Sequence, residues 1–262
     1  MKSESITSLL KDDATRSETV RNLAKNYIDA CAIIEDHSLQ DKLLKELMKE
    51  YSILQNKVEA LLKNTLPEVV ADEIKYRGKF SPSPCDCTIL FSDFIGFTSL
   101  AEQLSQTNLV EILNRLFCEF DDITLRHRGT KIKTAGDSYM VAFGTPTELK
   151  DHAYHAILAA MEMQHCIKEF NERNEYPFHM RVGIHSGPVI AGVVGKERLQ
   201  FDVFGDNVNI ASRFESAGAA GEVNVSNETY RRTKNYFKFI SRGRVALKHK
   251  EDMEAYFVVA KL

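Results

Sequence analysis

The spacing of apolar residues separates an N-terminal segment from the rest of the chain. Residues 1–64 contain neither proline nor glycine and are rich in Leu, Lys, Glu, Asp and Ala, a composition that favours helix. From residue 44 onward, apolar side chains recur every seven residues in two series, Leu44, Tyr51 and Val58, and Leu47, Leu54 and Leu61. This pattern predicts a parallel coiled-coil contact between two chains. The alternative is an amphipathic helix that packs on its own domain.

A proline-containing stretch follows this segment. Pro67 stands at a first-turn position with an acid beside it, which predicts a short helix ending at Ile74 or Lys75. Between Gly78 and Pro84 the glycine and prolines disfavour helix. We therefore expect an N-terminal helical and coiled-coil segment at 1–66, a short helix and linker at 67–84, and a larger domain at 85–262.

In the larger domain, short β-like runs alternate with helical patterns. The expected strands are Cys87–Ser92, Thr130–Thr134, Ser138–Phe143, Met180–His185, Val189–Val194, Glu222–Val225, Phe237–Ala246 and Ala255–Ala260. The expected helices cover about Leu100–Leu125, Thr147–Asn171 and Asp206–Glu215. The domain opens in the order β-α-β-β, and the whole pattern predicts an α+β fold with helices packed over a mixed sheet.

Charge and composition exclude several function classes. The 34 Lys and Arg residues against 37 Asp and Glu leave a net charge of −3, which gives no general attraction for nucleic acid or anionic lipid. The apolar-rich stretch Val182–Val194 is interrupted by Gly, His, Ser and Pro, so we expect no membrane span. The N-terminus lacks an apolar signal core, which favours a cytoplasmic location. The five cysteines have no paired CxxC spacing and are expected to be reduced and structural.

Two motifs place acidic residues next to glycine turns. In Phe91–Thr98 an apolar strand ends at Asp93, and a turn at Gly96 leads into a helix. A carboxylate at that place is a ligand for Mg²⁺, and the N–H groups of the turn can bind phosphate. In Lys131–Met140 a hairpin carries Asp137 at its tip, and neighbouring strands would bring the two acids together in a two-metal site. Taken singly, an Asp beside Gly more often forms a turn or a helix cap.

Two further motifs, Arg181–Gly192 and Gln200–Arg213, complete a recognisable set. Together the four motifs resemble the class III nucleotide cyclases, the adenylyl and guanylyl cyclase catalytic domain, from about Cys85 to Val259 in order and spacing. The resemblance implies a ferredoxin-like βαββαβ core in a head-to-tail dimer. It also implies conversion of a nucleoside triphosphate to its 3′,5′-cyclic monophosphate and pyrophosphate.

The resemblance assigns a metal site. Asp93 and Asp137 match the metal-binding aspartates, and Phe94 stands where the family usually has Ile and uses its main-chain carbonyl. Two divalent ions, Mg²⁺ or Mn²⁺, would activate the ribose 3′-OH and bind the triphosphate. The turn at Gly96, Phe97 and Thr98 is expected to bind phosphate oxygens.

The resemblance also assigns groups to the reacting phosphates. Asn209 and Arg213 match the transition-state pair of the family, and their i, i+4 spacing places both on one helix face. Without the resemblance, Arg213 would more often be a solvated charge. Lys248 matches the lysine that binds the terminal phosphates, although glycines usually stand at positions 249 and 251, and Lys250 is the alternative.

The choice of base follows from hydrogen-bonding chemistry together with the resemblance. Adenine offers an amino donor and a ring acceptor, and Asp202 and Lys133 supply the complementary acceptor and donor. Adenylyl members of the family carry Asp and Lys at these positions, whereas guanylyl members usually carry Glu and Cys. A buried polar mismatch rejects the wrong base, so the sequence predicts ATP as substrate and an adenylate cyclase.

The resemblance further implies two identical sites, each shared across a homodimer that forms through the catalytic domains and the N-terminal coiled coil. One alternative is a regulatory nucleotide-binding or dimerisation module without turnover, which predicts a damaged motif. The other alternative is a guanylate cyclase, which Lys133 and Asp202 disfavour.

Overall fold

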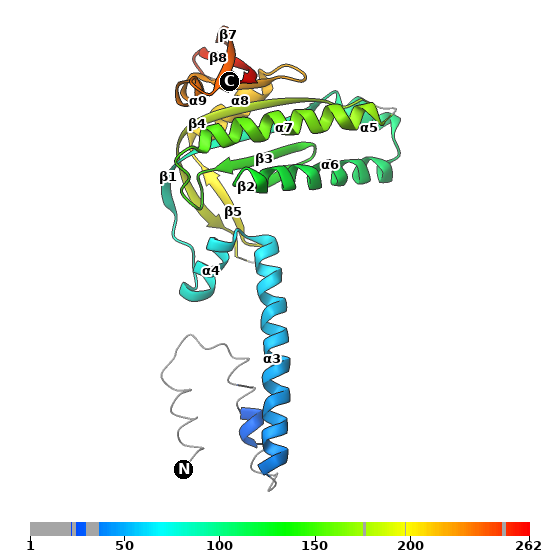
Figure 1. Cartoon of the computed structure of the whole chain (residues 1–262), viewed down its shortest axis with the longest axis vertical. Coiled ribbons are helices and arrows are strands. Elements are labelled where there is room, and N and C mark those ends of the chain that lie inside the picture. The colour runs from blue at the N-terminus through cyan, green and yellow to red at the C-terminus, as the bar shows by residue number, and fades with distance from the viewer. Residues whose placement is uncertain (1–21, 23–24, 30–36, 175–176, 197, 248–249) are drawn as a thin grey trace. The chain divides into compact units, whose positions relative to one another are not determined.

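The computed structural model describes residues 22, 25–29, 37–174, 177–196, 198–247 and 250–262 (Figure 1). The chain divides into two compact units, Met1–Lys79 and Phe80–Leu262. The division falls within the stretch that the sequence predicts as a linker. Most of the helix expected over residues 1–36 lies outside the described residues.

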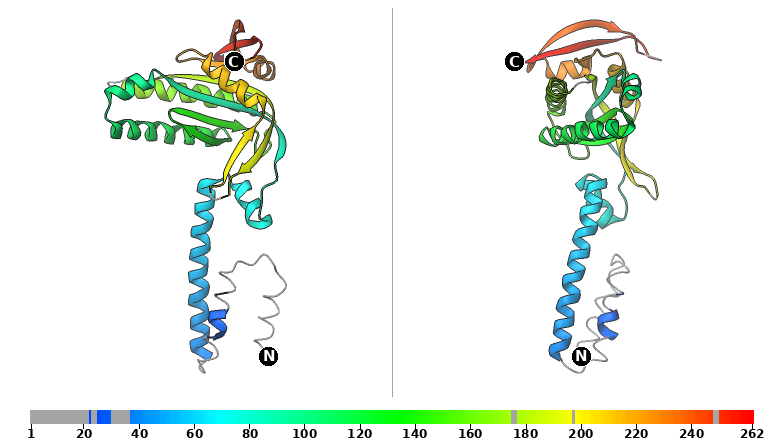
Figure 2. Two further views of the ribbon diagram at one scale, coloured as in Figure 1. Left: turned by 180° about the vertical axis from the view of Figure 1, so that it is seen from behind. Right: turned by 90° about the vertical axis from the view of Figure 1, so that its right-hand side faces the viewer.

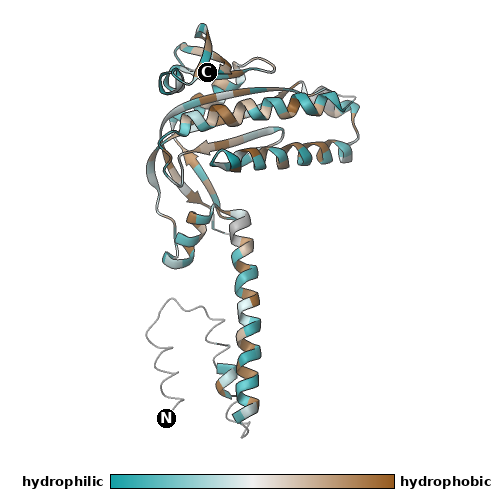
Figure 3. Cartoon of the chain, in the orientation of Figure 1, coloured by the Kyte–Doolittle hydropathy of each residue, from teal (hydrophilic) through white to brown (hydrophobic). Residues whose placement is uncertain are grey.

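The first unit contains the helices α3 (His37–Thr65) and α4 (Glu68–Arg77), and residues 25–29 are also helical. Most of the heptad positions of α3 are exposed, and Figure 3 shows apolar residues spread along the whole helix. Helix α4 continues to Arg77, two to three residues beyond the predicted end, and stops at Gly78, whose φ of 73° is accessible to glycine at little cost. The coiled-coil contact itself stays a prediction.

The second unit is a mixed α+β domain built on one sheet. Its strands are β1 (Ser83–Ile95), β2 (Gly129–Ala135), β3 (Ser138–Phe143), β4 (His179–Val194), β5 (Gln200–Phe204), β6 (Val223–Ser226), β7 (Phe237–Val245) and β8 (Met253–Lys261). Its helices are α5 (Phe97–Gln103), α6 (Gln106–Arg126), α7 (His152–Glu172), α8 (Asp206–Ser216) and α9 (Asn227–Thr233). The strand order is β2-β3-β1-β4-β6-β8-β7, with β5 paired to β4. The predicted α+β class is confirmed.

Helices cover both faces of this sheet. Helices α6 and α7 lie on one face, and α8 lies on the other face, as the view from behind shows (Figure 2). The main core lies under α6 and α7, where small residues of α7 such as Ala156 and Ala160 allow close approach to Val182 and Ile184 of β4. Of the helices in the described part of the chain, none is long and apolar enough to cross a membrane.

Several element predictions need correction. The two strands expected at Met180–His185 and Val189–Val194 form one strand, β4, because Gly187 and Pro188 also pair with β1. On its other edge β4 pairs with β6 only as far as Ile184 and with β5 only from Ile190 onward, so a proline lacking N–H is tolerated between them. Strand β5 and helix α9 were not predicted. The helix expected from Thr147 begins at His152, and β1 begins at Ser83.

Candidate active site

Two carboxylates meet where β1 ends. Asp93 lies near the end of β1, and Asp137 follows Gly136, whose φ of 63° forms the turn between β2 and β3. Oδ2 of Asp137 accepts a hydrogen bond from the N–H of Phe94 at 3.3 Å. Burial, and after it the nearby Asp93 carboxylate, raises the pKa of Asp137 above its usual value. The structure therefore brings the two predicted metal ligands together.

The main chain of Phe94 faces the same side as Asp137. In a strand, the N–H and C=O of one residue point to the same edge, and the N–H of Phe94 contacts Asp137. The carbonyl of Phe94 therefore also faces Asp137. The Phe94 ring is buried against Phe178, with ring centroids 5.3 Å apart, which fixes this part of the backbone in the core.

These groups fit a divalent metal ion. Two carboxylates and a main-chain carbonyl are the hard oxygen donors that Mg²⁺ and Mn²⁺ prefer, and adjacent negative charges are stabilised by a cation. The described residues contain no cluster of three or more His, Cys, Asp and Glu side chains that could hold a metal. The third donor of this set is a backbone oxygen, so such a cluster is not required.

A basic residue holds Asp93 in place. Arg181 lies opposite Asp93 in the pairing of β4 with β1, and its Nη2 donates to Oδ2 of Asp93 at 2.9 Å. Its Nε donates to Glu215 of α8, whose pKa burial raises. Arg181 stands in one of the four motifs, but no role was predicted for Arg181 or for Glu215. Strand register and helix docking bring these residues together, and the local sequence pattern specifies neither.

The predicted base-binding residues form a second cluster. Nζ of Lys133 in β2 donates to Oδ2 of Asp202 in β5 at 2.5 Å. Asp202 is 7% exposed, and its Oδ1 accepts the N–H of Val203 at 2.8 Å. The strand that the sequence analysis missed, β5, is the element that positions Asp202. Both residues of the predicted pair therefore lie together within one chain.

Helix α8 carries the predicted transition-state pair. Asn209 is exposed and Arg213 is half-buried, one turn apart on the helix. Nη1 of Arg213 is buried and has no hydrogen-bond partner among the described residues, so it can donate to an anion. In the described part of the single chain, no hydrogen bond or ion pair joins Asn209 or Arg213 to the two acids or to Lys133 and Asp202.

One face of β4 is shaped to receive α8. A Cβ added at Gly183 would lie 1.9 Å from the backbone nitrogen of Glu215, and one at Gly187 would lie 2.8 Å from Cγ of Asn207. Between the two glycines, Nε2 of His185 and Oδ1 of Asn207 are 2.9 Å apart, and Nδ1 of His185 is 2.8 Å from Oγ of Ser226. Alternating Arg, Gly, His and Gly residues thus dock the helix that carries Asn209 and Arg213.

The remaining predicted phosphate contacts are only partly described. Lys248 lies outside the described residues. The alternative, Lys250, donates to Oδ2 of Asp206 at 2.6 Å and so lies at the first turn of α8. Gly96 has a φ of 72° in the turn after β1, and α5 begins at Phe97. The side chain of Thr98 is outside the described set.

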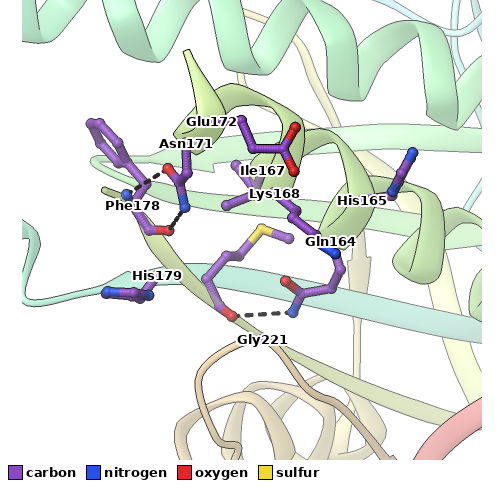
Figure 4. Close-up of a pocket in the computed structure, with 10 residues that line it drawn as sticks. Gln164, His165, Ile167, Lys168, Asn171, Glu172, Phe178, His179 and Gly221 are labelled. Carbon is purple, nitrogen blue, oxygen red and sulfur yellow. Dashed lines mark hydrogen bonds between the residues drawn. The ribbon is translucent and has the colours of Figure 1, made fainter. Parts of the chain in front are cut away.

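A pocket of about 570 Å³ lies between the end of α7 and the start of β4 (Figure 4). Some of the polar side chains that line it form hydrogen bonds with main-chain groups of the fold. Asn171 bonds both the N–H and the carbonyl of Phe178 at 2.8 Å, and Gln164 donates to the carbonyl of Met180 at 3.1 Å. None of the predicted site residues lines this pocket.

Known proteins resemble the domain that carries these clusters. The family described as "Adenylate and Guanylate cyclase catalytic domain" matches residues 81–260. The chain is 37% identical over 256 residues to the human "Guanylate cyclase soluble subunit beta-2", and the aligned region covers 95% of this chain and 42% of that protein. It is 35% identical over 226 residues to an "Adenylate cyclase" of Mycobacterium bovis, and the aligned region covers 86% of this chain and 51% of that protein.

A solved structure gives the same result for the fold. The adenylyl cyclase CyaB from P. aeruginosa superposes with a TM-score of 0.67 and 32% identity, over 69% of this chain and 97% of that one. The chain spans about half or less of the length of the two curated relatives. The relatives include both adenylate and guanylate cyclases.

Proposed function

Because the chain belongs to the adenylate and guanylate cyclase catalytic domain family, we propose that it is an adenylate cyclase, which converts ATP to 3′,5′-cyclic AMP and pyrophosphate. The observation that carries the choice of ATP is the contact of Lys133 with Asp202. A buried carboxylate that is paired with an ammonium group offers one acceptor and one donor to a base. Adenine presents the complementary donor and acceptor, whereas guanine presents two donors and one acceptor along the same edge.

Each cluster has a role in this proposal. Divalent ions held by Asp93, Asp137 and the carbonyl of Phe94 would lower the pKa of the ribose 3′-OH and neutralise charge on the pyrophosphate. Arg213, with its unpartnered Nη1, donates to oxygens of the α-phosphate, and Asn209 orients the ribose.

The contacts to the other phosphates rest on the motifs and on the resemblance. The N–H groups of Gly96, Phe97 and Thr98 are assigned to phosphate oxygens beside the metal site. Lys248 or Lys250 is assigned to the terminal phosphates. The ion pair of Lys250 with Asp206 is exposed, so it costs little to open when a nucleotide binds.

The direct test is product analysis. The purified protein is incubated with ATP or GTP, first with Mg²⁺ and then with Mn²⁺, and the products are identified by mass spectrometry. Cyclic AMP from ATP, with little cyclic GMP from GTP, supports the proposal. Binding of ATP by folded dimeric protein without any cyclic nucleotide would instead support a regulatory nucleotide-binding module.

Guanylate cyclase is the second candidate, because relatives of that activity match the chain as well as adenylate cyclases do. The double variant Lys133→Glu with Asp202→Cys should shift the ratio of kcat/KM for ATP and GTP toward GTP by about 100-fold. Lys131→Gln is the matched control, because this lysine lies in the same strand and bonds Asp121 instead. An unchanged ATP preference in the folded double variant would contradict the assignment of the base-binding pair.

We also propose a homodimer with shared sites, joined through the catalytic domains and through the heptad positions of α3. The exposure of Leu54, Val58 and Leu61 along α3 supports the coiled-coil part of this proposal. In the described residues of the single chain, no hydrogen bond or ion pair joins the two acids to Arg213, which is compatible with a site completed by a second copy.

Subunit mixing tests the shared site. Asp93→Ala and Arg213→Ala proteins should each be nearly inactive, whereas a mixed dimer regains one site with all groups intact. Random exchange should restore roughly a quarter of the wild-type activity. Each variant incubated with itself is the control. If exchange is verified and no activity returns, the sites are not shared in this way.

A further inference from the structure

Two cysteines lie near the start of β1, on the side of the sheet that α8 covers. Cys85 and Cys87 are two residues apart in an extended strand, so both side chains point to the same face. Cys87 is opposite Gly187 of β4, and Gly187 faces Asn207 of α8. Cys87 is fully buried, whereas Cys85 is partly exposed. The pair therefore has one thiol in the interior and one that solvent can reach.

The groups that bond Cys85 can all donate a hydrogen. Its sulfur forms hydrogen bonds with the thiol of Cys87, the hydroxyl of Thr145 and the main-chain N–H of Ala191. Thr145 is 3% exposed, so its hydroxyl lies away from bulk water. Hydrogen-bond donors stabilise a negatively charged thiolate more than a neutral thiol. The surroundings of Cys85 therefore suit the charged form of its side chain.

The nearest carboxylate opposes this effect only weakly. Asp86 points to the other face of β1, and Nη1 of Arg232 donates to its Oδ2 at 2.8 Å. Donation from Cys87 lowers the pKa of the Cys85 thiol to about 6, although burial acts in the opposite direction. The same contact, followed by burial, raises the pKa of Cys87, which keeps its proton. At neutral pH Cys85 is the thiolate, the form of cysteine that reacts.

From this cluster we propose that Cys85 is a modification site, at which a low-molecular-weight disulfide such as glutathione disulfide forms a mixed disulfide with the chain. The Cys85 thiolate attacks one sulfur of the reagent, and a new S–S bond forms as the S–S bond of the reagent breaks. The second half of the reagent leaves as a thiolate and takes up a proton from water. Cys85 is thereby oxidised and the reagent is reduced to one free thiol.

The geometry of β1 predicts that this mixed disulfide persists. Residues two apart in an extended strand have Cα atoms about 6.7 Å apart, close to the upper limit of about 6.8 Å for a disulfide. Pairing of Cys85 with Val189 and of Cys87 with Gly187 keeps β1 extended here. A Cys85–Cys87 disulfide would require this pairing to break, so we expect the mixed disulfide and not the internal one.

A group attached to Cys85 would lie beside the start of α8. Val189, which is opposite Cys85, lies next to Gly205, the N-cap residue of α8, because a Cβ added at Gly205 would be 3.8 Å from Cα of Val189. Helix α8 carries Asn209 and Arg213. We therefore expect the adduct to displace this helix and to lower cyclase activity reversibly, a consequence that rests on the proposed function.

The first experiment measures the reactivity of Cys85 in the full reduced chain. Labelling by iodoacetamide is timed between pH 5 and 9, and labelled peptides are quantified by mass spectrometry. The rate for Cys85 should change less than about twofold between pH 7 and 8.5, whereas that of an ordinary thiol with a pKa of about 8.5 rises more than about 10-fold. A short cysteine-containing peptide is the reference. A Cys85 profile that follows this peptide would refute the proposal.

Variants of the donors test the cause of this reactivity. Cys87→Ala and Thr145→Val each remove one donor, and each should raise the midpoint of the Cys85 profile by about one pH unit. Cys87→Ser keeps an O–H at the same place, so its midpoint should stay near that of the wild type. This comparison separates donation from a general loss of packing, and Thr145→Val suffices if Cys87→Ala does not fold. Unchanged midpoints in the folded variants would contradict the role of the donors.

The second experiment treats the chain with glutathione disulfide at neutral pH and locates the product by mass spectrometry. One glutathione on Cys85, removed by dithiothreitol, supports the proposal. An internal Cys85–Cys87 disulfide, or modification of other cysteines only, would overturn it.

Activity assays on the same samples test the consequence for α8. Formation of cyclic nucleotide should fall about 10-fold or more in the modified protein and return with dithiothreitol, whereas Cys85→Ser should be insensitive to glutathione disulfide. Unchanged activity of fully modified protein would refute the link to α8 and leave the modification site standing. If the unmodified protein forms no cyclic nucleotide, the proposed function fails, and the location of the adduct still decides whether Cys85 is the modification site.

Discussion

The two faces of β4 differ in the side chains that they present and in the way these side chains contact the helices. Toward α7 the strand presents Met180, Val182 and Ile184, which are buried in the main core. Toward α8 it presents Arg181, Gly183, His185 and Gly187, each of which meets one particular group of α8 or of the metal site. Both faces are covered by helices, yet only the face toward α7 is lined by the apolar side chains that are usual at buried positions.

The difference lies in how each face obtains its stability. The α7 face buries apolar area, a contribution that depends on volume and tolerates similar side chains. The α8 face relies on the close approach of the α8 backbone at Gly183 and of the Asn207 side chain at Gly187, and on hydrogen bonds of Arg181 and His185. Such contacts contribute only when their geometry is kept. The α8 face is therefore the one that positions Asn209 and Arg213, and the one that substitutions should damage most selectively.

The largest effect is expected from Gly183→Ala. The added methyl would lie 1.9 Å from the nitrogen and 2.4 Å from Cα of Glu215, so the α8 backbone would have to move. We expect a loss of about 3 kcal/mol in the free energy of unfolding. Because Arg181 and Arg213 depend on the same helix, activity should fall by about 100-fold or more in the protein that still folds. Urea denaturation and product formation measure the two effects.

A second glycine of β4 provides the control. At Gly192 the nearest atoms to an added Cβ lie 3.7 Å away, on Pro82, which is ordinary contact. Gly192→Ala should therefore leave stability within about 0.5 kcal/mol. Equal stability of the two alanine variants would show that α8 does not rest on Gly183 as described.

An intermediate effect is expected from protonation of His185. Burial lowers the pKa of His185 below its ordinary value of 6.5, so the folded chain stays neutral where the unfolded chain binds a proton. The stabilisation is complete above about pH 6.5 and decreases as the pH falls toward the folded-state pKa. The decrease is at most about 1.4 kcal/mol per pH unit for this one residue.

The prediction is tested with His185→Gln, which retains an amide for Asn207 and cannot be protonated in this range. Urea denaturation at pH 7.5, 6.5 and 5.5 should show a smaller loss of stability on acidification in the variant than in the wild type. His152, whose pKa burial also lowers, remains in both proteins and contributes equally. Parallel pH profiles for the two proteins would contradict the role of His185.

The sequence predicts those parts of the fold that local patterns encode. Strand β3 and helix α8 were predicted within a residue of their bounds, because apolar runs or helical spacing mark them. Strand β5 has only five residues and is held by pairing with β4, a contact distant in sequence. Helix α9 has no apolar periodicity, and its N-cap is Ser226, the last residue of β6, whose Oγ accepts the N–H of Thr229. Such elements depend on partners that a local pattern does not contain.

The same limit applies to the site. Asp93, Asp137, Lys133 and Asp202 were identified by their place in motifs, and the structure puts them in two pairs. The bridge from Arg181 to Glu215 could not be foreseen, because it needs the register of β4 against β1 and the docking of α8. An alternation of Arg, Gly, His and Gly in a strand is itself a signal. A face with little apolar area that is nonetheless buried indicates a specific partner.

The smallest effect is expected on the opposite face, from Ile184→Val. This substitution removes one methyl group from the main core, where Ile184 is fully buried, and should cost about 1 kcal/mol of stability. The contacts of Arg181, Gly183 and His185 are on the other side of the strand and stay in place. The Mn²⁺ requirement and the ratio of ATP to GTP turnover should therefore equal those of the wild type. If Ile184→Val changed either property, the two faces of β4 would not be independent, and the metal site would depend on the packing of the whole sheet.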